Sequence, residues 1–459
     1  ASAGDAVALR DALDHLGAEF SAVTGLDPTR NAGDTYAGRA LCHEETTRDL
    51  DAVVGGEVLD AIAAPLEVLL LAARWLSVAL ADAYGAALAE LHAELGGTEV
   101  PLGELWYLAQ GMLFGAGDRP VDRVAADFAQ RWAGLFGLAD VAPGTSSVRV
   151  SAADLRERAA QVFDATAPGW AAARIHSPDL HICAPDVDAV RRGEFTVVLG
   201  EMHTAWATFD CSILAWGHDD WPALTEAMRA DMGPGRIMPL YPVGWPRYSG
   251  RLSFAFENDS DVSLAFTAAS GADPARVVPV TDVTVVREGD ALVARTSDGR
   301  SWPMLETFAG LLAMHAADGF KLVAASGHTP RISIDRLVVA RESWRTTIGE
   351  TPMPTATGLD NRFRAVRRWR REMGLPERVY VKLGTEIKPC FVDFTSPVYV
   401  AGLCNMARGA FQKSGPDVPL VISEMLPTPD QAWVPDGAGR RYFSELRLQL
   451  RDPNTGGQR

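Results

Sequence analysis

The densest group of reactive side chains in this sequence is a run of six arginines within ten residues, from Arg362 to Arg371. In a helix, four of them share one face: Arg364, Arg367, Arg368 and Arg371. Like charges at i,i+4 spacing destabilise a helix by roughly a few tenths of a kcal/mol per pair, so this face needs a compensating partner. Guanidinium groups bind phosphates in a bidentate manner, which makes a nucleic acid one such partner. Carboxylates such as Glu372 and Glu377 are the alternative.

A second polar stretch, Ala173–His181, precedes an apolar segment. We expect it to form a loop that presents three side chains to a cleft, and these are the candidate catalytic residues: Arg174, His176 and Ser177. In the alternative interpretation, the stretch is an ordinary loop held by its own Ser-Pro-Asp turn and by a pair between Arg174 and Asp179. The sequence leaves both interpretations open.

Two further clusters have side chains that bind metals in other proteins, Glu201-x-His203 and His218-Asp-Asp220. They lie fifteen residues apart in the sequence, with the apolar run Ile213–Trp216 between them. We favour a histidine on a strand face that bonds a neighbouring carboxylate, and we expect no metal. The sequence also has no P-loop, no G-x-S-x-G, no H-E-x-x-H and no G-x-G-x-x-G after a strand, so we expect no bound cofactor.

The composition limits how the chain could bind RNA. It has 459 residues, 43 basic and 59 acidic, and a formal net charge of −16. A protein that coats nucleic acid carries the opposite charge, so any contact with RNA must come from a local basic patch. The five cysteines are scattered without a C-x-x-C pair, and the N-terminus has no signal-peptide pattern, which indicates free thiols in a reducing cytoplasm. The apolar stretch Ala61–Leu80 is interrupted by Pro65, Glu67 and Arg74, so we expect a buried helix and no membrane span.

The order of apolar residues predicts an α+β fold. Residues 1–147 read as mainly helical, with a first helix on the spacing of Leu9, Leu13, Leu16 and Phe20. Residues 148–459 read as an α+β region of mixed, mainly antiparallel sheets with packed helices, and this region carries the arginine-rich helix. The predicted strands include Asp179–Ala184, Glu194–Trp206 and Arg251–Glu257, and a hairpin turn is predicted at Arg287–Asp290.

Several stretches, taken in order, resemble the glutamylation domain of lantibiotic dehydratases, the enzymes of class I lanthipeptide and thiopeptide biosynthesis. They are Thr35-Tyr-Ala-Gly-Arg39, Ala73-Arg-Trp75, Leu199-Gly-Glu-Met-His203, Pro330-Arg-Ile332, Arg341-Glu-Ser-Trp344, Arg368-Trp-Arg-Arg-Glu-Met-Gly-Leu-Pro376, Lys388-Pro-Cys-Phe-Val-Asp-Phe-Thr-Ser-Pro397, Ser423-Glu-Met-Leu-Pro427 and Ser444-Glu-Leu-Arg447. None of them is a catalytic signature alone, but together and in this order they extend over nearly the whole chain.

The resemblance implies that the protein moves glutamate from glutamyl-tRNA, its co-substrate, onto Ser or Thr hydroxyls of a precursor peptide. A separate elimination domain then removes glutamate. It also implies that Arg364, Arg367, Arg368 and Arg371 bind tRNA. The sequence shows neither the elimination domain nor the N-terminal segment of the family, so we expect either a fragment or one part of a split enzyme. Such a part would act with a separate N-terminal half and an elimination-domain protein.

Two other functions fit the same residues. A peptide–aminoacyl-tRNA ligase would use the same charged tRNA but extend a carrier peptide. A non-catalytic scaffold would hold the precursor peptide or a partner enzyme. The sequence does not identify the precursor peptide, the amino acid on the tRNA or the oligomeric state.

Overall fold

The structure, a computed structural model, describes residues 4–29, 41–42, 52–215, 218–242, 245, 254–267, 273–323 and 327–453. The stretch Thr35-Tyr-Ala-Gly-Arg39 and the first three residues of the strand predicted at Arg251–Glu257 lie outside these ranges. The chain divides into two compact units, Ala1–Val53 with Pro435–Arg440, and Val54–Val434 with Arg441–Arg459.

In the smaller unit the structure describes one helix, α1 (Ala6–Thr24). The carboxylate of Asp5 caps its first turn by accepting from the amides of Val7 and Ala8 at 3.0 Å. Gly25, at φ 70°, ends it in the left-handed conformation that favours glycine. The helix predicted from the leucine spacing is confirmed, and it contains no buried residue.

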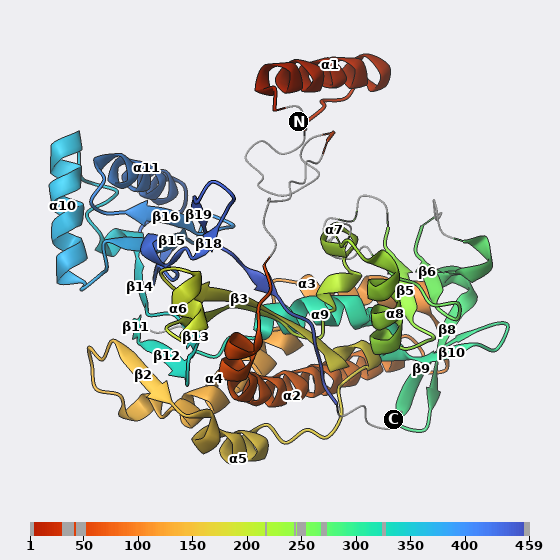
Figure 1. Ribbon diagram of the computed structural model, residues 1–459. Helices are drawn as coiled ribbons and strands as arrows, with labels where there is room; N and C mark the ends of the chain where they lie inside the picture. Colours follow the sequence, from red (N-terminus) through yellow and green to blue (C-terminus); the bar gives the residue numbers. More distant parts are fainter. Residues whose placement is uncertain are drawn as a thin grey trace. The chain divides into compact units, whose positions relative to one another are not determined.

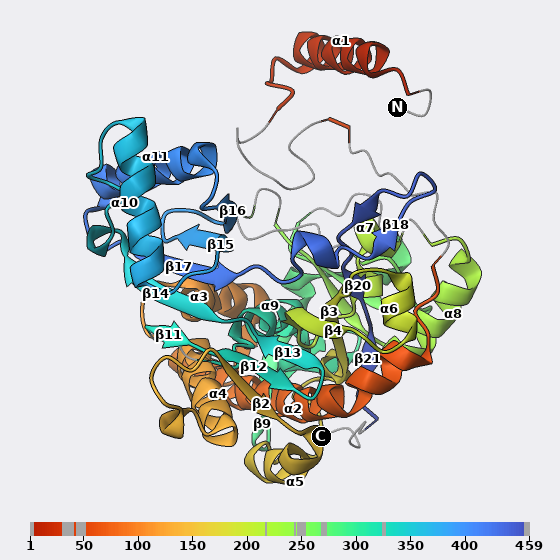
Figure 2. The ribbon, with the colours of Figure 1, turned by 60° about the vertical axis from the view of Figure 1, so that its left-hand side comes forward.

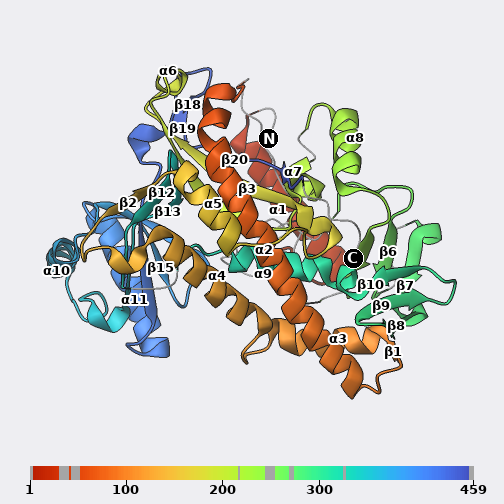
Figure 3. The same cartoon turned by 90° about the horizontal axis from the view of Figure 1, so that it is seen from below.

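The larger unit is built on α2 (Gly56–Glu94), a helix of 39 residues. Its middle is fully buried, with Leu69, Ala72, Leu76 and Leu80 at 0% exposure. Figure 3 shows α2 crossing the unit with shorter helices packed along it: α3 (Leu102–Phe114), α4 (Pro120–Phe136), α5 (Ala152–Val162) and α9 (Ala309–Gly319). By length and composition α2 could cross a membrane, but 56% of its most apolar window is buried inside the structure, as in the core helix of a globular protein.

A seven-stranded sheet lies against these helices, with strand order β2-β12-β13-β4-β3-β20 and β21 also paired to β3 (Figure 2). Its strands are β2 (Ser147–Val150), β3 (Ile175–Cys183), β4 (Thr196–His203), β12 (Arg331–Ile334), β13 (Leu337–Ala340), β20 (Leu446–Arg447) and β21 (Leu450–Arg451). Along each strand, successive side chains point to opposite faces of the sheet. Leu180, Ile182, Val197 and Leu199 join the large core with the helices, whereas Cys183 and Val198 belong to a small cluster of their own.

A second layer is the five-stranded sheet β11-β14-β17-β15-β16, whose face is covered by α10 (Leu359–Glu372) and α11 (Pro397–Ser414) (Figure 1). Its strands are β11 (His328–Thr329), β14 (Ser343–Thr347), β15 (Arg378–Leu383), β16 (Cys390–Asp393) and β17 (Pro419–Glu424). Inward residues of β15 and β17, such as Val381 and Ile422, pack with Trp369 of α10 and Leu403 of α11 in a separate core.

The remaining described elements are peripheral. An antiparallel sheet contains β1 (Glu99–Pro101), β8 (Val283–Glu288), β9 (Ala291–Thr296) and β10 (Ser301–Pro303), and a parallel sheet contains β5 (Ile237–Leu240), β6 (Val262–Ala265) and β7 (Val277–Pro279). Short elements are α6 (Val187–Arg191), α7 (Ser212–Ala215), α8 (Trp221–Met232), β18 (Val434–Pro435) and β19 (Arg441–Tyr442).

The predicted α+β fold class and the hairpin at Arg287–Asp290 are confirmed. The loop predicted at Ala173–His181 is wrong, because most of it is the interior strand β3, covered on both faces. In the described part of Arg251–Glu257, only Phe254 forms a bridge, to Cys211. A division of the chain at residue 147 stays a prediction about its organisation.

The last described turn of the chain is fixed by a buried ion pair. Arg74 of α2 donates through Nε and Nη2 to the Asp452 carboxylate at 2.5 and 2.7 Å, and Asp452 is completely buried. The Asp452 amide donates to the carbonyl of Arg174 at 2.7 Å. Because Asp452 directly follows β21, this pair holds the C-terminal strands along β3.

We predict that Asp452→Asn lowers the free energy of unfolding by about 3–5 kcal/mol, because it removes the carboxylate charge that faces the buried Arg74 guanidinium. Urea denaturation followed by circular dichroism measures the change. Asp188→Asn is the matched control, since Asp188 pairs with Arg191 at 2.9 Å while both side chains are 73% exposed, and exposed pairs contribute about 0–1 kcal/mol. Equal effects of the two substitutions would contradict the proposed clamp.

Candidate nucleic-acid interface and polar centre

The arginine-rich segment is the amphipathic helix α10 (Leu359–Glu372), as predicted. Val366 and Trp369 face the core and fix which side points outward. Two arginines are used structurally. Arg362 donates to the carbonyl of Ala356 and to Asn405, and Arg370 donates to the carbonyl of Leu375 beyond the helix end.

The other four arginines are the predicted set. Arg364, Arg368 and Arg371 are exposed, and Arg367 is half-buried with its guanidinium 5.5 Å from the ring centre of Phe363. Among the residues that the structure describes, none of the four pairs with a carboxylate, so the predicted partners Glu372 and Glu377 do not neutralise them. The face therefore has unneutralised positive charge on a body of formal net charge −16.

Of the three candidate catalytic residues, His176 and Ser177 lie at the start of β3, and Arg174 lies in the short 3-10 helix just before it. Ser177 is fully buried, donates to the carbonyl of Trp206 at 2.8 Å and accepts from the amide of Thr208 at 3.1 Å. The Nδ1 atom of His176 accepts from the amide of Ala205 at 3.1 Å, and burial lowers the pKa of this histidine to about 4. Both side chains thus hold the turn after β4, and their catalytic role stays a prediction without a described opening to substrate.

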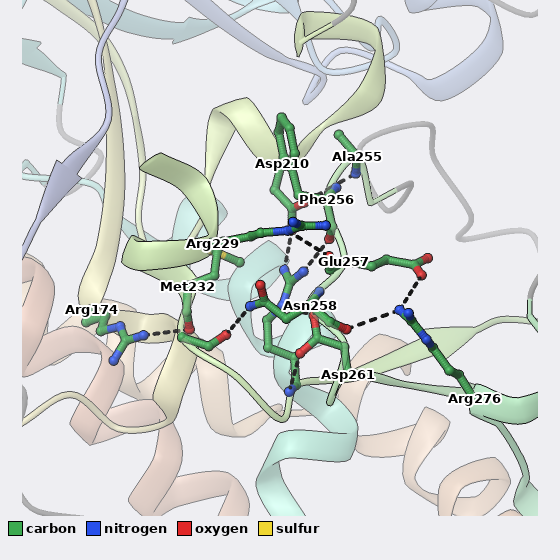
Figure 4. Close-up of polar contacts among 12 residues, drawn as sticks. Arg174, Asp210, Arg229, Met232, Ala255, Phe256, Glu257, Asn258, Asp261 and Arg276 are labelled. Carbon is green, nitrogen blue, oxygen red and sulfur yellow. Dashed lines mark hydrogen bonds and ion pairs between the residues drawn. The ribbon is translucent and has the colours of Figure 1, made fainter. Parts of the chain in front are cut away.

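Arg174 faces a different neighbourhood, shown in Figure 4, where it donates to the carbonyl of Met232 at the end of α8. Beside it, Arg236 bridges two buried carboxylates, Asp210 at 2.7 Å and Asp261 at 3.0 Å. Asp210 also accepts from the amides of Ala255 and Phe256. Burial raises the pKa of Asp210 and the Arg236 charge opposes that rise. Asp210, Arg236 and Asp261 pair with one another inside the fold, so they organise the chain around α8.

A polar centre that the sequence did not single out as one site lies on the seven-stranded sheet. It is on the face opposite the one that packs in the large core. β3 and β4 shift register between Pro178 and Leu180, so Gly200 and Glu201 together oppose Asp179. Such a bulge redirects side chains. Here it gathers Asp179, Glu201 and His203, with His203 Nδ1 3.6 Å from Asp179 Oδ2 and His203 Nε2 3.4 Å from Glu201 Oε2.

Gly200 is needed at this bulge for close approach. A Cβ atom there would stand 3.1 Å from His181 Nε2 and 3.3 Å from the Asp179 carbonyl oxygen. Both distances are shorter than ordinary van der Waals contact, so a side chain would push β3 and β4 apart at this centre.

The C-terminal strand β20 completes the centre from the opposite side of β3. Arg447 pairs with Asp179 in the strand register, and its Nη2 lies 3.2 Å from Asp179 Oδ2. Glu445 pairs with Arg447 at 3.1 Å and approaches His181 Nε2 at 3.5 Å. The stretches Leu199–His203 and Ser444–Arg447, which carried the resemblance in the sequence, therefore meet in space.

Burial divides the centre into a floor and a rim. The side chains of Asp179 and His203 are 4% and 3% exposed, whereas Glu201 is 41% and Arg447 is 30% exposed. Burial raises the pKa of Asp179 to about 6, against the opposing effects of His203 and Arg447. Among described residues, Asp179 Oδ1 and His203 Nε2 are buried without a hydrogen-bond partner.

Asp179, Glu201 and His203 also satisfy the spacing of a metal site, since their ligand atoms lie within 4.8 Å of one another. Carboxylate and imidazole groups are suitable ligands for zinc. However, the Arg447 guanidinium already lies 3.2 Å from Asp179 and supplies positive charge where a cation would bind. The site therefore has a built-in counter-charge, and we assign no metal to it.

Three more of the resembling stretches meet next to this centre. Glu424 accepts from Arg331 Nε at 2.8 Å and from the amide of Glu342 at 2.8 Å, which joins β12 to the segment that enters β14. Arg341 donates to the carbonyls of Leu199 at 3.4 Å and Leu426 at 3.0 Å. These contacts connect the five-stranded sheet to β4 beside the polar centre.

Comparison with known proteins gives one sequence family. Residues 311–403 match the family described as "Lantibiotic dehydratase, N terminus", a segment that includes α10. No curated protein matches the chain.

Three similar solved structures have titles that name related proteins. The glutamylation domain TbtB from thiomuracin biosynthesis has a TM-score of 0.51 and 18% identity, over 85% of this chain and 50% of that chain. TbtB bound to 5'-phosphodesmethylglutamycin has a TM-score of 0.47 and 20% identity, over 85% and 50%. The tRNA dependent lantibiotic dehydratase MibB from Microbispora sp. 107891 has a TM-score of 0.46 and 17% identity, over 72% and 32%. This chain thus spans half or less of the structures it matches.

The family segment and the first of these superpositions address the resemblance drawn from the sequence. The segment covers the arginine helix and all strands of its sheet except β17, and the superposition extends over most of the chain. The resemblance is confirmed: this protein is similar to lantibiotic dehydratases and has the fold of a glutamylation domain.

Proposed function

We propose that this protein transfers glutamate from glutamyl-tRNA to Ser and Thr side chains of a ribosomal precursor peptide, the first half of dehydration in lanthipeptide or thiopeptide biosynthesis. The shared fold and the family segment support this class of enzyme. A separate N-terminal half and an elimination-domain protein are the proposed protein partners, as the resemblance to the family implies.

The observation that carries the use of tRNA is the arginine face of α10, formed by Arg364, Arg367, Arg368 and Arg371. Each guanidinium is permanently charged, and none has a carboxylate partner among the described residues. Unpaired like charges on one helix face destabilise the free protein, and a phosphate backbone would relieve that repulsion. The face lies inside the segment that matches the family.

The proposed reaction requires that the acceptor end of the tRNA is held in place and that the Ser or Thr hydroxyl of the peptide is oriented toward it. It also requires a group that accepts the hydroxyl proton. The reaction exchanges one ester for another, so its free-energy change is small. Positioning and electrostatics can supply the rate acceleration without a covalent enzyme intermediate. Binding of tRNA at α10 would supply the first requirement. No bound metal or organic cofactor enters this scheme, and glutamyl-tRNA is the co-substrate.

We predict that charge reversal at Arg364, Arg368 and Arg371 weakens tRNA binding and lowers the slope of log K against log salt by roughly one for each phosphate that the protein no longer neutralises. Filter binding over a range of salt concentrations measures both quantities. Reversal of Arg191 and Arg192, two exposed arginines at the C-terminal end of α6, is the matched control. Binding and slope equal to those of the control would exclude α10 as the tRNA site.

We predict that the protein, alone or with partner subunits encoded beside it, adds glutamyl groups from charged tRNA to a Ser/Thr-rich core peptide. Mass spectrometry detects the added groups, and mild hydroxylamine distinguishes the labile esters from amides. Hydroxylamine-stable products at a peptide terminus would indicate the peptide–aminoacyl-tRNA ligase instead. Absence of any adduct in every combination would leave the non-catalytic scaffold as the function.

A further inference from the structure

The polar centre on β3, β4 and β20 has a fixed tautomer at its middle. His203 Nδ1 lies 3.3 Å from the carbonyl oxygen of Ser177, which can only accept a hydrogen bond, so Nδ1 carries a hydrogen. Asp179, 3.6 Å from the same nitrogen, reinforces this orientation. In the neutral imidazole, Nε2 is consequently the atom with the free electron pair.

The free electron pair of Nε2 faces a second acceptor. Glu201 Oε2 lies 3.4 Å away, and no described residue donates a hydrogen bond to Nε2. An unprotonated imidazole nitrogen and a carboxylate oxygen at this distance repel each other, and a single proton between them removes the repulsion. His203 and Glu201 therefore form a pair built to gain and lose one proton.

The pair connects the interior to the surface. His203 is 3% exposed, but Glu201 is 41% exposed and forms part of the rim. Behind His203, the buried Asp179 supplies negative charge that stabilises an imidazolium, and Arg447 at 3.2 Å helps to keep Asp179 ionised. This order, from exposed carboxylate to imidazole to buried carboxylate, matches the arrangement in which a base is oriented by a second group.

We propose that Glu201, His203 and Asp179 form a proton relay for the acyl transfer, with Glu201 as the catalytic residue that contacts the acceptor hydroxyl. His203 and Asp179 are positioning residues. The proposal rests on the proposed function and names the group that performs its proton transfer.

The proton balance of the step is complete. The hydroxyl oxygen of the acceptor Ser or Thr forms a bond to the ester carbonyl carbon, and its proton passes to the Glu201–His203 pair. The bond between that carbon and the tRNA ribose oxygen then breaks, and the ribose oxygen takes the proton from the pair. The pair ends in its starting state, and no oxidant or reductant is required.

The pH dependence follows from the groups that face Asp179, which are His203 and Glu201 on β4 and Arg447 and Glu445 on the C-terminal strand. Lowering the pH through the Asp179 pKa of about 6 protonates this carboxyl and removes the charge that stabilises the imidazolium. We expect the transfer rate to fall as the pH decreases through that value. Asp179→Asn should abolish this inflection.

The test is single-turnover glutamyl transfer with the full chain and any partner subunit it requires, together with tRNA binding measured separately. Glu201→Gln and His203→Gln should each slow transfer by about 100-fold or more, the usual effect of removing a general base, while tRNA binding is unchanged. The matched controls are Glu194→Gln, an exposed glutamate paired with Arg192 just before β4, and His218→Gln, an exposed histidine before α8. Circular dichroism checks that every variant is folded.

A second measurement does not depend on transfer activity. In protein labelled with ¹⁵N-histidine, Glu201→Gln should move the ¹⁵N chemical shift of His203 Nε2 at a fixed pH, because Nε2 then faces a neutral amide in place of a carboxylate. An unchanged chemical shift would overturn the relay, as would transfer by both variants within twofold of the controls. Transfer abolished by EDTA and restored by zinc would overturn it in favour of a bound cation. A wild-type protein that transfers no glutamate would overturn the proposed function and, with it, the relay.

Discussion

The buried ion pair between Arg74 and Asp452 is the constraint on which the rest of the site depends. A charge inside a protein needs its partner, so α2 and the end of the chain must meet at this point. The requirement holds β21 and β20 along β3, although almost 380 residues separate the two partners in sequence. Without that alignment, Arg447 would not lie opposite Asp179, and the buried carboxylate would lack its guanidinium counter-charge.

The two sheets of the larger unit carry different parts of the proposed function. The five-stranded sheet supports α10 through a core of its own, so the arginines point outward because Val366 and Trp369 point inward. The seven-stranded sheet instead carries polar chemistry within its strands, at a bulge where two residues of β4 oppose one of β3. Arg341 and the Arg331–Glu424 pair join the layers beside that bulge.

The sequence predicted the elements better than the site. Periodicity and turn residues located α1, the arginine helix and the β8–β9 hairpin, because these are determined by local spacing. It failed at Ala173–His181, where His176 and Ser177 were expected in a loop but lie in the interior strand β3. Those side chains tolerate burial because backbone groups such as the Trp206 carbonyl and the Ala205 amide satisfy them, and sequence spacing does not reveal such partners.

The polar centre was missed for a related reason. The sequence favours a histidine on a strand face beside a neighbouring carboxylate, but it does not predict that Asp179 and Arg447, from distant strands, lie next to this histidine and Glu201. Contacts between distant strands depend on register, and a bulge changes register by one residue. The usable signal was that the stretches Leu199–His203 and Ser444–Arg447 both carried the family resemblance.

Amide hydrogen exchange of the wild-type protein and Asp452→Asn tests most directly whether the C-terminal clamp assembles this centre. In the wild type, the Leu448 amide donates to the carbonyl of Pro178 at 3.2 Å and should exchange slowly. In Asp452→Asn, we predict fast exchange over residues 446–451 while β4 and α2 keep their protection. Unchanged slow exchange in that strand would contradict the account, because the polar centre would then form without the clamp.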